Sequence, residues 1–177
     1  MKIHLLRHFK VKDNTSSWLT SDGFNQWVEE YDKLPLVIKN ITLPEEINLI
    51  ISSTLSRAKR TVKELPLPLI ETIYTDSLRE VGSRVFFKTE IKLQKYIWFT
   101  MGSFFWYFNL LDGENRVDSE KRAKDLVCQI RAFKKESILI VSHGFFMKVL
   151  AKELKKENFL GEIDFRPKNG KIYTFSL

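Results

Sequence analysis

Residues 3–8 of the chain read Ile-His-Leu-Leu-Arg-His, and residues 138–144 read Ile-Leu-Ile-Val-Ser-His-Gly. In both stretches a compact apolar run is followed at once by polar side chains that can do chemistry. Near-continuous apolar runs are typical of strands buried on both faces, as in a parallel sheet covered by helices. The two stretches therefore predict two buried strands of one sheet, with reactive side chains at their carboxyl ends.

Apolar runs of this kind alternate along the chain with segments of helical periodicity. Further strands are predicted at 47–51, more weakly at 70–74, and as a late edge strand at 172–175. Helical apolar stripes lie at 24–31, 55–65, 123–133 and 146–154. Thr20 and Ser21 are cap candidates for the first helix, and the third is expected to start near Asp118 or Ser119. Such alternation predicts a layered α/β domain.

Length and composition limit the class of protein. The 177 residues suit a single domain, residues 1–177, that carries a small insertion. Hydrophobic residues make up 44% and aromatic residues 13%, which excludes a wholly disordered chain. Cys128 is the only cysteine, which excludes a disulfide framework and a paired-cysteine zinc site. It stands among apolar neighbours, so we expect it in the core.

The segment 81–117 interrupts the alternation and holds 10 of the 23 aromatic residues. We expect a small aromatic-rich helical insertion, whose side chains serve either as core packing or as a lid or specificity wall. Its uncharged part, 96–111, spans 16 residues and falls short of the roughly 17–25 that a membrane-spanning helix needs. Aromatic residues this dense without interleaved Lys or Arg favour packing over base stacking. Neither a membrane nor a nucleic acid is therefore expected as a partner.

The net charge and the first residues of the chain bear on the expected partner and compartment. The formal net charge is +7, and residues 81–177, with 18 basic and 11 acidic side chains, supply all of it. This excess either steers an anionic substrate or serves only solubility. Because Arg7, His8 and Lys10 break the apolar start at once, no secretory signal is predicted, and the cytoplasm is the expected compartment.

Four groups of polar residues follow the predicted strands, at the edge where open α/β sheets bind ligands. They are Arg7 with His8, Ser52 and Ser53 with Arg57, Glu80, and His143 with Gly144. Guanidinium groups grip phosphate oxygens, a neutral imidazole can attack phosphorus, and a carboxylic acid can protonate a leaving oxygen. The helices that begin near residue 55 and after Gly144 would also direct N–H groups at an anion. The set therefore suits phosphoryl transfer.

These residues resemble, in order, the motifs of the histidine phosphatase superfamily, in the branch that contains cofactor-dependent phosphoglycerate mutase. The matching segments are Leu5-Leu6-Arg7-His8, residues 19–26, residues 52–61, Leu78-Arg79-Glu80 and Val141-Ser142-His143-Gly144. Five segments in the family's order make a specific pattern that covers most of the chain. The resemblance implies a three-layer α/β/α fold with a mostly parallel central sheet, and neither a metal nor a cofactor.

The resemblance also implies a role for each matching residue. His8 would be the nucleophile that forms a phosphohistidine. The phosphoryl group would be held by Arg7, Arg57, His143 and the Gly144 N–H. Glu80 would be the general acid and base, although Glu90 is a second carboxylate nearby. His4, which has no reactive neighbour of this kind, is expected to be structural.

The position after the first histidine is glycine in the family and Phe9 here, followed by Lys10. We expect Phe9 to narrow the mouth of the pocket and Lys10 to bind a distal anion of the substrate. Further substrate-binding candidates are Asn14, Ser17, Arg84 and Lys88.

The predicted function is hydrolysis of phosphate monoesters on a phosphorylated small molecule or phosphoprotein. A phosphoglycerate-mutase-type transfer and a catalytically silent phospho-ligand-binding module are the alternatives. The chain is shorter than the mutases it resembles, which favours hydrolysis. The oligomeric state stays open.

Overall fold

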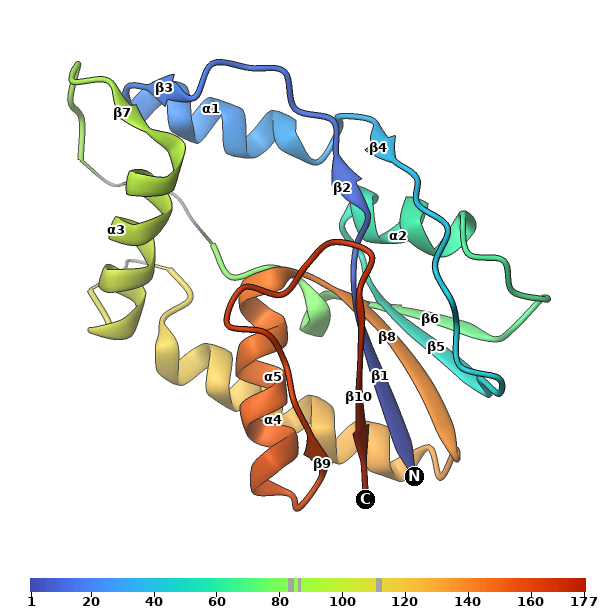
Figure 1. Cartoon of the computed structure of the whole chain (residues 1–177). Helices are drawn as coiled ribbons and strands as arrows, with labels where there is room; N and C mark the ends of the chain where they lie inside the picture. Colours follow the sequence, from blue (N-terminus) through green and yellow to red (C-terminus); the bar gives the residue numbers. More distant parts are fainter. Residues whose placement is uncertain (83–84, 86, 111–112) are drawn as a thin grey trace.

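The computed structural model describes residues 1–177 except 83–84, 86 and 111–112. Its centre is a six-stranded sheet in the order β6-β5-β8-β1-β10-β9 (Figure 1). The strands are β1 (Lys2–Arg7), β5 (Leu49–Ser53), β6 (Thr72–Thr75), β8 (Ser137–Ser142), β9 (Leu160–Gly161) and β10 (Ile172–Ser176). β6, β5, β8 and β1 are parallel, whereas β10 is antiparallel to both β1 and β9. The sheet is therefore mostly parallel.

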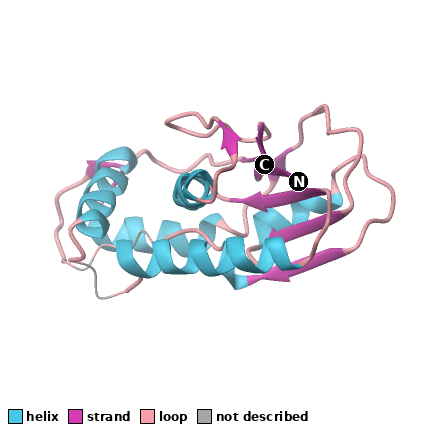
Figure 2. Cartoon of the chain, turned by 90° about the horizontal axis from the view of Figure 1, so that it is seen from below, coloured by secondary structure: helices cyan, strands magenta, loops and turns pink. Residues whose placement is uncertain are grey.

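Helices cover both faces of this sheet, because successive side chains of a strand point to opposite sides. Leu5 and Ile140 belong to the apolar cluster shared with α4 (Arg116–Ala132) and α5 (Gly144–Lys156). Leu6 and Leu139, one position away, belong to the cluster shared with α2 (Ser56–Lys63). Figures 1 and 2 show the layers from two sides. The predicted three-layer α/β/α fold is confirmed.

The aromatic-rich segment 81–117 contains a helix, α3 (Lys95–Tyr107), which lies with α1 (Ser21–Tyr31) beyond the carboxyl edge of the parallel strands (Figure 1). Phe24 of α1 and Trp98 of α3 are fully buried in one apolar cluster, with ring centroids 6.0 Å apart. The short strands β3 (Trp18–Leu19) and β7 (Leu93–Gln94) pair beside them, and β2 (Lys10–Val11) pairs with β4 (Leu36–Val37). α1, from outside 81–117, is thus packed on the insertion; we call α1 and α3 together the cap.

Two local expectations need correction. α4 begins at Arg116, earlier than predicted, because Asn115 accepts the N–H groups of Val117 and Asp118 and Asp118 completes the capping box. Cys128 is exposed rather than buried. At 3.6 residues per turn it stands off the stripe that buries Val127 and Ile130. In the described part of the chain, no helix is both long and apolar enough to cross a membrane.

Candidate active site

The register of the central strands brings the reactive side chains together. Arg7 of β1 is paired with Ser142 of β8, and the N–H of His8 donates to the Ser142 carbonyl at 3.0 Å. His8 and His143 each follow their strand by one residue, so their rings are neighbours with centroids 5.1 Å apart. Parallel pairing thus places both histidines at the carboxyl edge of the sheet, as predicted.

His8 is held in one tautomer and in its neutral form. The side chain is 2% exposed, and its Nδ1–H donates to the Phe9 carbonyl at 2.7 Å. A neutral imidazole has one N–H, so this bond leaves Nε2 with a free lone pair. Burial, and then the positive charges of Arg57 and Arg7, lower the pKa of His8 to about 3. Nε2 is therefore unprotonated at neutral pH and can act as a nucleophile.

Three buried polar atoms around His8 have no hydrogen-bond partner in the described part of the chain: Nε of Arg7, Nε of Arg57 and Nδ1 of His143. The other ends of these groups are anchored. Arg7 Nη1 donates to the Pro167 carbonyl at 2.7 Å, and His143 Nε2 lies 2.8 Å from the Ser53 hydroxyl. A buried polar group without a partner costs about 1–3 kcal/mol. Their convergence beside a nucleophile is the arrangement that an anion would complete.

Asp32, which the sequence did not single out, occupies the amino end of α2. Its Oδ2 accepts the N–H of Ser56 at 2.8 Å, and its Oδ1 accepts the N–H of Arg57 at 3.1 Å and Arg57 Nη1 at 2.9 Å. Burial raises the pKa of Asp32, but these N–H groups and the charge of Arg57 outweigh it and hold the pKa below its usual value. The expectation that this helix end binds the substrate anion is therefore wrong, because an internal carboxylate takes its N–H groups.

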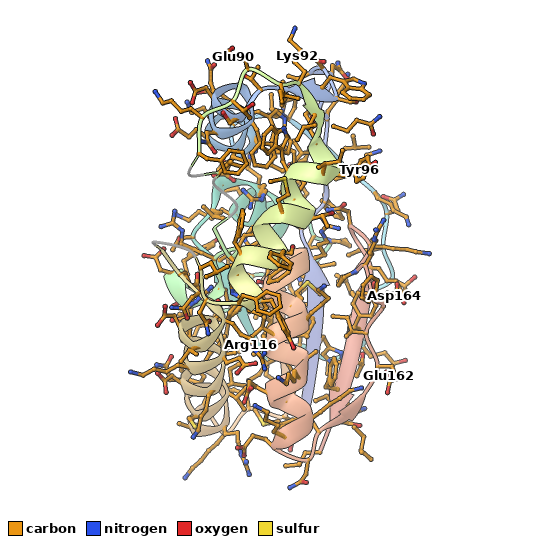
Figure 3. The ribbon with its side chains drawn as sticks, turned by 90° about the vertical axis from the view of Figure 1, so that its left-hand side faces the viewer. Glu90, Lys92, Tyr96, Arg116, Glu162 and Asp164 are labelled. Atoms are coloured by element: carbon orange, nitrogen blue, oxygen red, sulfur yellow. The ribbon has the colours of Figure 1, made fainter. Side chains whose placement is uncertain are left out.

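Glu80 has the same relation to α5. It lies beyond β6 and the short 3₁₀ helix η1 (Asp76–Leu78). Its Oε1 accepts the N–H of Phe146 at 2.9 Å, and its Oε2 accepts the N–H of Phe145 at 3.2 Å. The positive end of α5 thus fixes the position of the predicted acid. Glu90, the other carboxylate considered, is exposed at the far end of the cap (Figure 3).

Gly144 lets a guanidinium group lie against the first turn of α5. A Cβ at this position would be 3.0 Å from both Cζ and Nε of Arg7. A side chain at position 144 would therefore require Arg7 to shift by a few tenths of an ångström, and glycine lets Arg7 keep its place.

A cavity of about 700 Å³, which we call the phosphoryl cavity, joins most of the predicted residues. Arg7, His8, Lys10, Arg57 and Glu80 line it. His143 is fully buried and does not line this cavity. Its ring lies next to the ring of His8, which does line it. Among the described residues, no group of His, Cys, Asp or Glu is arranged to hold a metal ion.

Other predicted substrate-binding residues lie elsewhere. Asn14, Ser17 and Lys88 are exposed and outside the lining of the phosphoryl cavity, and Arg84 lies outside the described residues. The lining instead includes residues that no motif indicated: Asp13, Trp27, Tyr31, Asp32 and Asn169. Asn169 donates to the His8 carbonyl at 2.8 Å. It lies 161 positions away in the chain, so no local pattern could have indicated it.

Phe9 does not narrow the pocket, contrary to expectation. Its side chain is 1% exposed and belongs to the apolar cluster between the sheet and α2, with Ala58. It is outside the lining of the phosphoryl cavity. Gly170, at φ 67°, lies over the ring, where a Cβ would be 3.2 Å from Phe9 Cδ1. The residue that replaces the family's glycine is therefore part of the core.

The chain belongs to the histidine phosphatase superfamily (branch 1), whose family model matches residues 3–177. Among curated protein sequences, no significantly similar protein is found.

Solved structures of similar fold include three phosphatases. A mycobacterial glucosyl-3-phosphoglycerate phosphatase in complex with VO3 has 19% identity and a TM-score of 0.57, covering 98% of this chain and 90% of that chain. A phosphoserine phosphatase from Entamoeba histolytica has 16% identity and a TM-score of 0.56, covering 98% and 89%. The alpha-ribazole phosphatase from Shigella flexneri has the same identity, TM-score and coverages. At these identities the likeness establishes the fold.

Proposed function

We propose that this chain hydrolyses phosphate monoesters through a covalent phosphohistidine at His8. One observation carries the proposal: a neutral, buried imidazole with a free Nε2 adjoins unpaired guanidinium N–H groups in a cavity that also contains Glu80. A nucleophile, an anion-binding group and a proton donor are the parts that the reaction needs.

In the first step, His8 Nε2 attacks phosphorus and the bond from phosphorus to the ester oxygen breaks. The leaving oxygen takes a proton from the Glu80 carboxylic acid and departs as the alcohol. Arg7 and Arg57 hold the oxygens of the transferring phosphoryl group and balance their negative charge. His143 donates to the same group through Nδ1–H when the Ser53 hydroxyl donates to its Nε2.

In the second step, water attacks the phosphohistidine and gives its proton to the Glu80 carboxylate. The bond between phosphorus and Nε2 breaks, inorganic phosphate forms, and His8 is again neutral. A phosphorylated small molecule suits a cavity of about 700 Å³ better than a folded phosphoprotein does.

The decisive experiment measures hydrolysis of 4-nitrophenyl phosphate by the wild type and by His8→Ala. We expect a loss of about a thousandfold or more, because the covalent route is removed. His4→Gln is the matched control, since His4 lies outside the lining of the phosphoryl cavity and its ring bonds Thr174 and Ser137. Equal rates for wild type and His8→Ala would refute the phosphohistidine mechanism.

The products separate the alternatives. Release of inorganic phosphate in step with the phenol supports hydrolysis, and retention of the phosphoryl group on a second alcohol would indicate a mutase. Tight binding of vanadate without turnover would indicate a silent phospho-ligand-binding module.

A further inference from the structure

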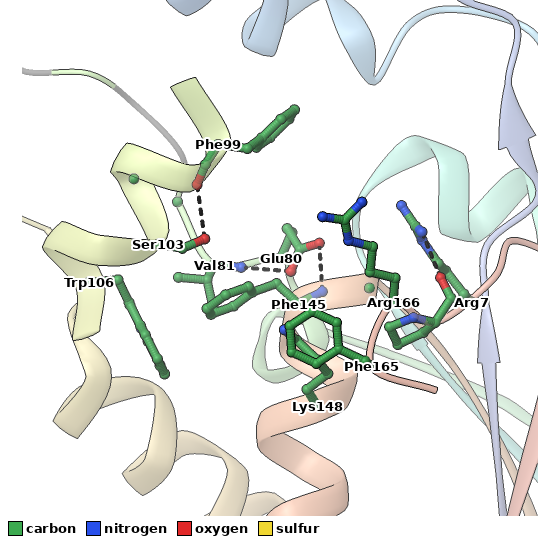
Figure 4. Close-up of a pocket in the computed structure, with 14 residues that line it drawn as sticks. Arg7, Glu80, Val81, Phe99, Ser103, Trp106, Phe145, Lys148, Phe165 and Arg166 are labelled. Atoms are coloured by element: carbon green, nitrogen blue, oxygen red, sulfur yellow. Dashed lines mark hydrogen bonds between the residues drawn. The ribbon is translucent and has the colours of Figure 1, made fainter. Parts of the chain in front are cut away.

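A second cavity, of about 320 Å³, adjoins the phosphoryl cavity on the side of Glu80. Five of the described residues line both cavities: Arg7, Glu80, Val81, Gly82 and Phe99. Figure 4 shows Glu80 between Phe99 and Ser103 of α3 on one side and Arg166 and Arg7 on the other. We call this second space the aromatic cavity.

Aromatic rings form its walls. Phe99 and Trp106 come from α3, Phe145 from α5, and Phe165 from the loop before β10 (Figure 4). Trp106 and Phe145 meet edge to face, with ring centroids 4.8 Å apart. Flat rings in such an arrangement suit a flat ring of a ligand, which could stack or contact their edges.

Gly102 shows that the space beside α3 is open. It is buried and lines the aromatic cavity, yet a Cβ built on it would meet nothing within 4 Å. A buried helical residue normally packs against a neighbour, so the open space at Gly102 is room for a ligand.

The charges of the aromatic cavity favour an anion. Among the described residues, its lining contains the basic side chains of Arg7, Lys148 and Arg166 and one acidic side chain, that of Glu80. Lys148 Nζ lies 4.9 Å from the centroid of Phe145 and 5.1 Å from that of Phe165. Among the described residues, Arg166 has no ion pair, and in Figure 4 its guanidinium group lies between Glu80 and Arg7.

The chemistry of Glu80 determines which part of a substrate would reach this space. In an in-line displacement the leaving oxygen is opposite the attacking atom, His8 Nε2, and within reach of the acid that protonates it. Glu80 forms the boundary between the two cavities. The group attached to the leaving oxygen therefore extends from Glu80 into the aromatic cavity.

We infer that the aromatic cavity is a leaving-group subsite for phosphate esters of aromatic alcohols that carry their own anionic group. The ring packs between Phe99, Trp106 and Phe145, and the anion pairs with Arg166. This inference rests on the proposed phosphatase function, because it assigns the alcohol that this reaction releases.

The first test fills the cavity. Gly102→Leu places a side chain in the open space and favours the helix, so folding is expected to survive. In Gly102→Leu we expect kcat/KM for 4-carboxyphenyl phosphate to fall. The rate of oxygen exchange between labelled inorganic phosphate and water should fall about tenfold less. Exchange needs only the phosphoryl cavity. Thr100→Leu is the control, since Thr100 is exposed on the same helix and outside both cavities.

The second test removes the charge that selects the anion. Wild type and Arg166→Gln are compared on phenyl phosphate and 4-carboxyphenyl phosphate. We expect the preference for the carboxylated ester to fall about tenfold in the variant. The preference is the ratio of kcat/KM for the carboxylated ester to kcat/KM for phenyl phosphate. Comparing this ratio between wild type and variant cancels the intrinsic difference in reactivity between the two leaving groups.

The outcomes separate the two proposals. If wild type and His8→Ala exchange phosphate oxygens equally, the proposed phosphatase function fails. If exchange depends on His8 but Gly102→Leu hydrolyses the carboxylated ester as well as Thr100→Leu does, the subsite is wrong. An unchanged ester preference in Arg166→Gln overturns the assignment of the anion.

Discussion

The imidazole of His8 is kept neutral by burial between two guanidinium groups. Its pKa is about 3 in the folded chain against 6.5 for a free histidine. Between these values the unfolded state binds a proton that the folded state does not. The free energy of unfolding therefore rises with pH across this window, and acid removes stability as pH falls from 6.5 toward 3.

This difference predicts an acid sensitivity that belongs to one residue. Relative to about pH 8, the His8 contribution to the free energy of unfolding should be lower by about 2 kcal/mol at about pH 5. His8→Asn keeps a side-chain N–H but cannot titrate, so its stability should fall less over the same range. Urea unfolding of both proteins at the two pH values measures the difference. Parallel losses would contradict the neutral state of His8.

The burial of Phe9 leads to a second prediction for a single residue. Because its ring is buried between the sheet and α2, Phe9→Ala leaves a cavity and should lower the free energy of unfolding by about 3–5 kcal/mol. Phe133→Ala, at a residue 40% exposed, is the control and should cost less. Thermal and urea unfolding check both. A Phe9→Ala protein of wild-type stability and higher activity would restore the view of Phe9 as a barrier at the mouth.

At the scale of elements, both helices that begin at the site have N–H groups of their first turns bound by carboxylates of the chain. Asp32 comes from just beyond α1, and Glu80 from beyond η1. Each carboxylate satisfies helix N–H groups and holds a neighbouring part of the site in place. The substrate is thus left to the side chains of Arg7 and Arg57 more than to helix ends.

Replacing Asp32 tests this arrangement. Asp32→Ala removes the cap of α2 and the ion pair of Arg57, so the free energy of unfolding should fall by about 2–4 kcal/mol. The Arg57 side chain also loses its anchor, and kcat/KM should fall by at least about tenfold.

Asp32→Asn keeps a cap acceptor but not the charge and should recover part of the stability. Asp125→Ala, at an exposed position of α4, is the control. Calorimetry and steady-state kinetics on the three variants give both readings. Equal stability of Asp32→Ala and Asp125→Ala would show that Asp32 does not hold α2.

At the scale of the whole molecule, the excess charge gathers partly beside the site. A groove of about 580 Å³ begins at Arg7 and is lined by Lys10, Lys39, Arg166 and Lys168; the part of the chain that the structure describes adds no acidic residue to this lining. Such a groove attracts dianions from solution, and salt screens the attraction.

Salt should therefore slow the association of the substrate with the protein more than it slows the chemical step. Between about 20 and 300 mM sodium chloride, kcat/KM for 4-nitrophenyl phosphate should fall several-fold while kcat changes little. The double substitution Lys39→Gln and Lys168→Gln should show a shallower dependence. Lys63→Gln with Lys124→Gln removes the same charge at exposed positions outside the groove and should retain the wild-type slope. Identical slopes for both double variants would exclude steering by this groove.

The sequence by itself predicted five of the six strands of the central sheet, all but β9, and the helices that alternate with them. It also indicated His8 and His143 directly after their strands, Arg57 at the start of α2, and Glu80. These features follow from apolar periodicity and from motifs in which the informative residues are neighbours in the chain. The tertiary structure alone decided that Asp32 caps α2, that Phe9 enters the core, and that α1 packs on α3. It also decided that rings from α3, α5 and the loop before β10 line one cavity. Each of these depends on contacts between residues far apart in the chain, and no local pattern records such contacts.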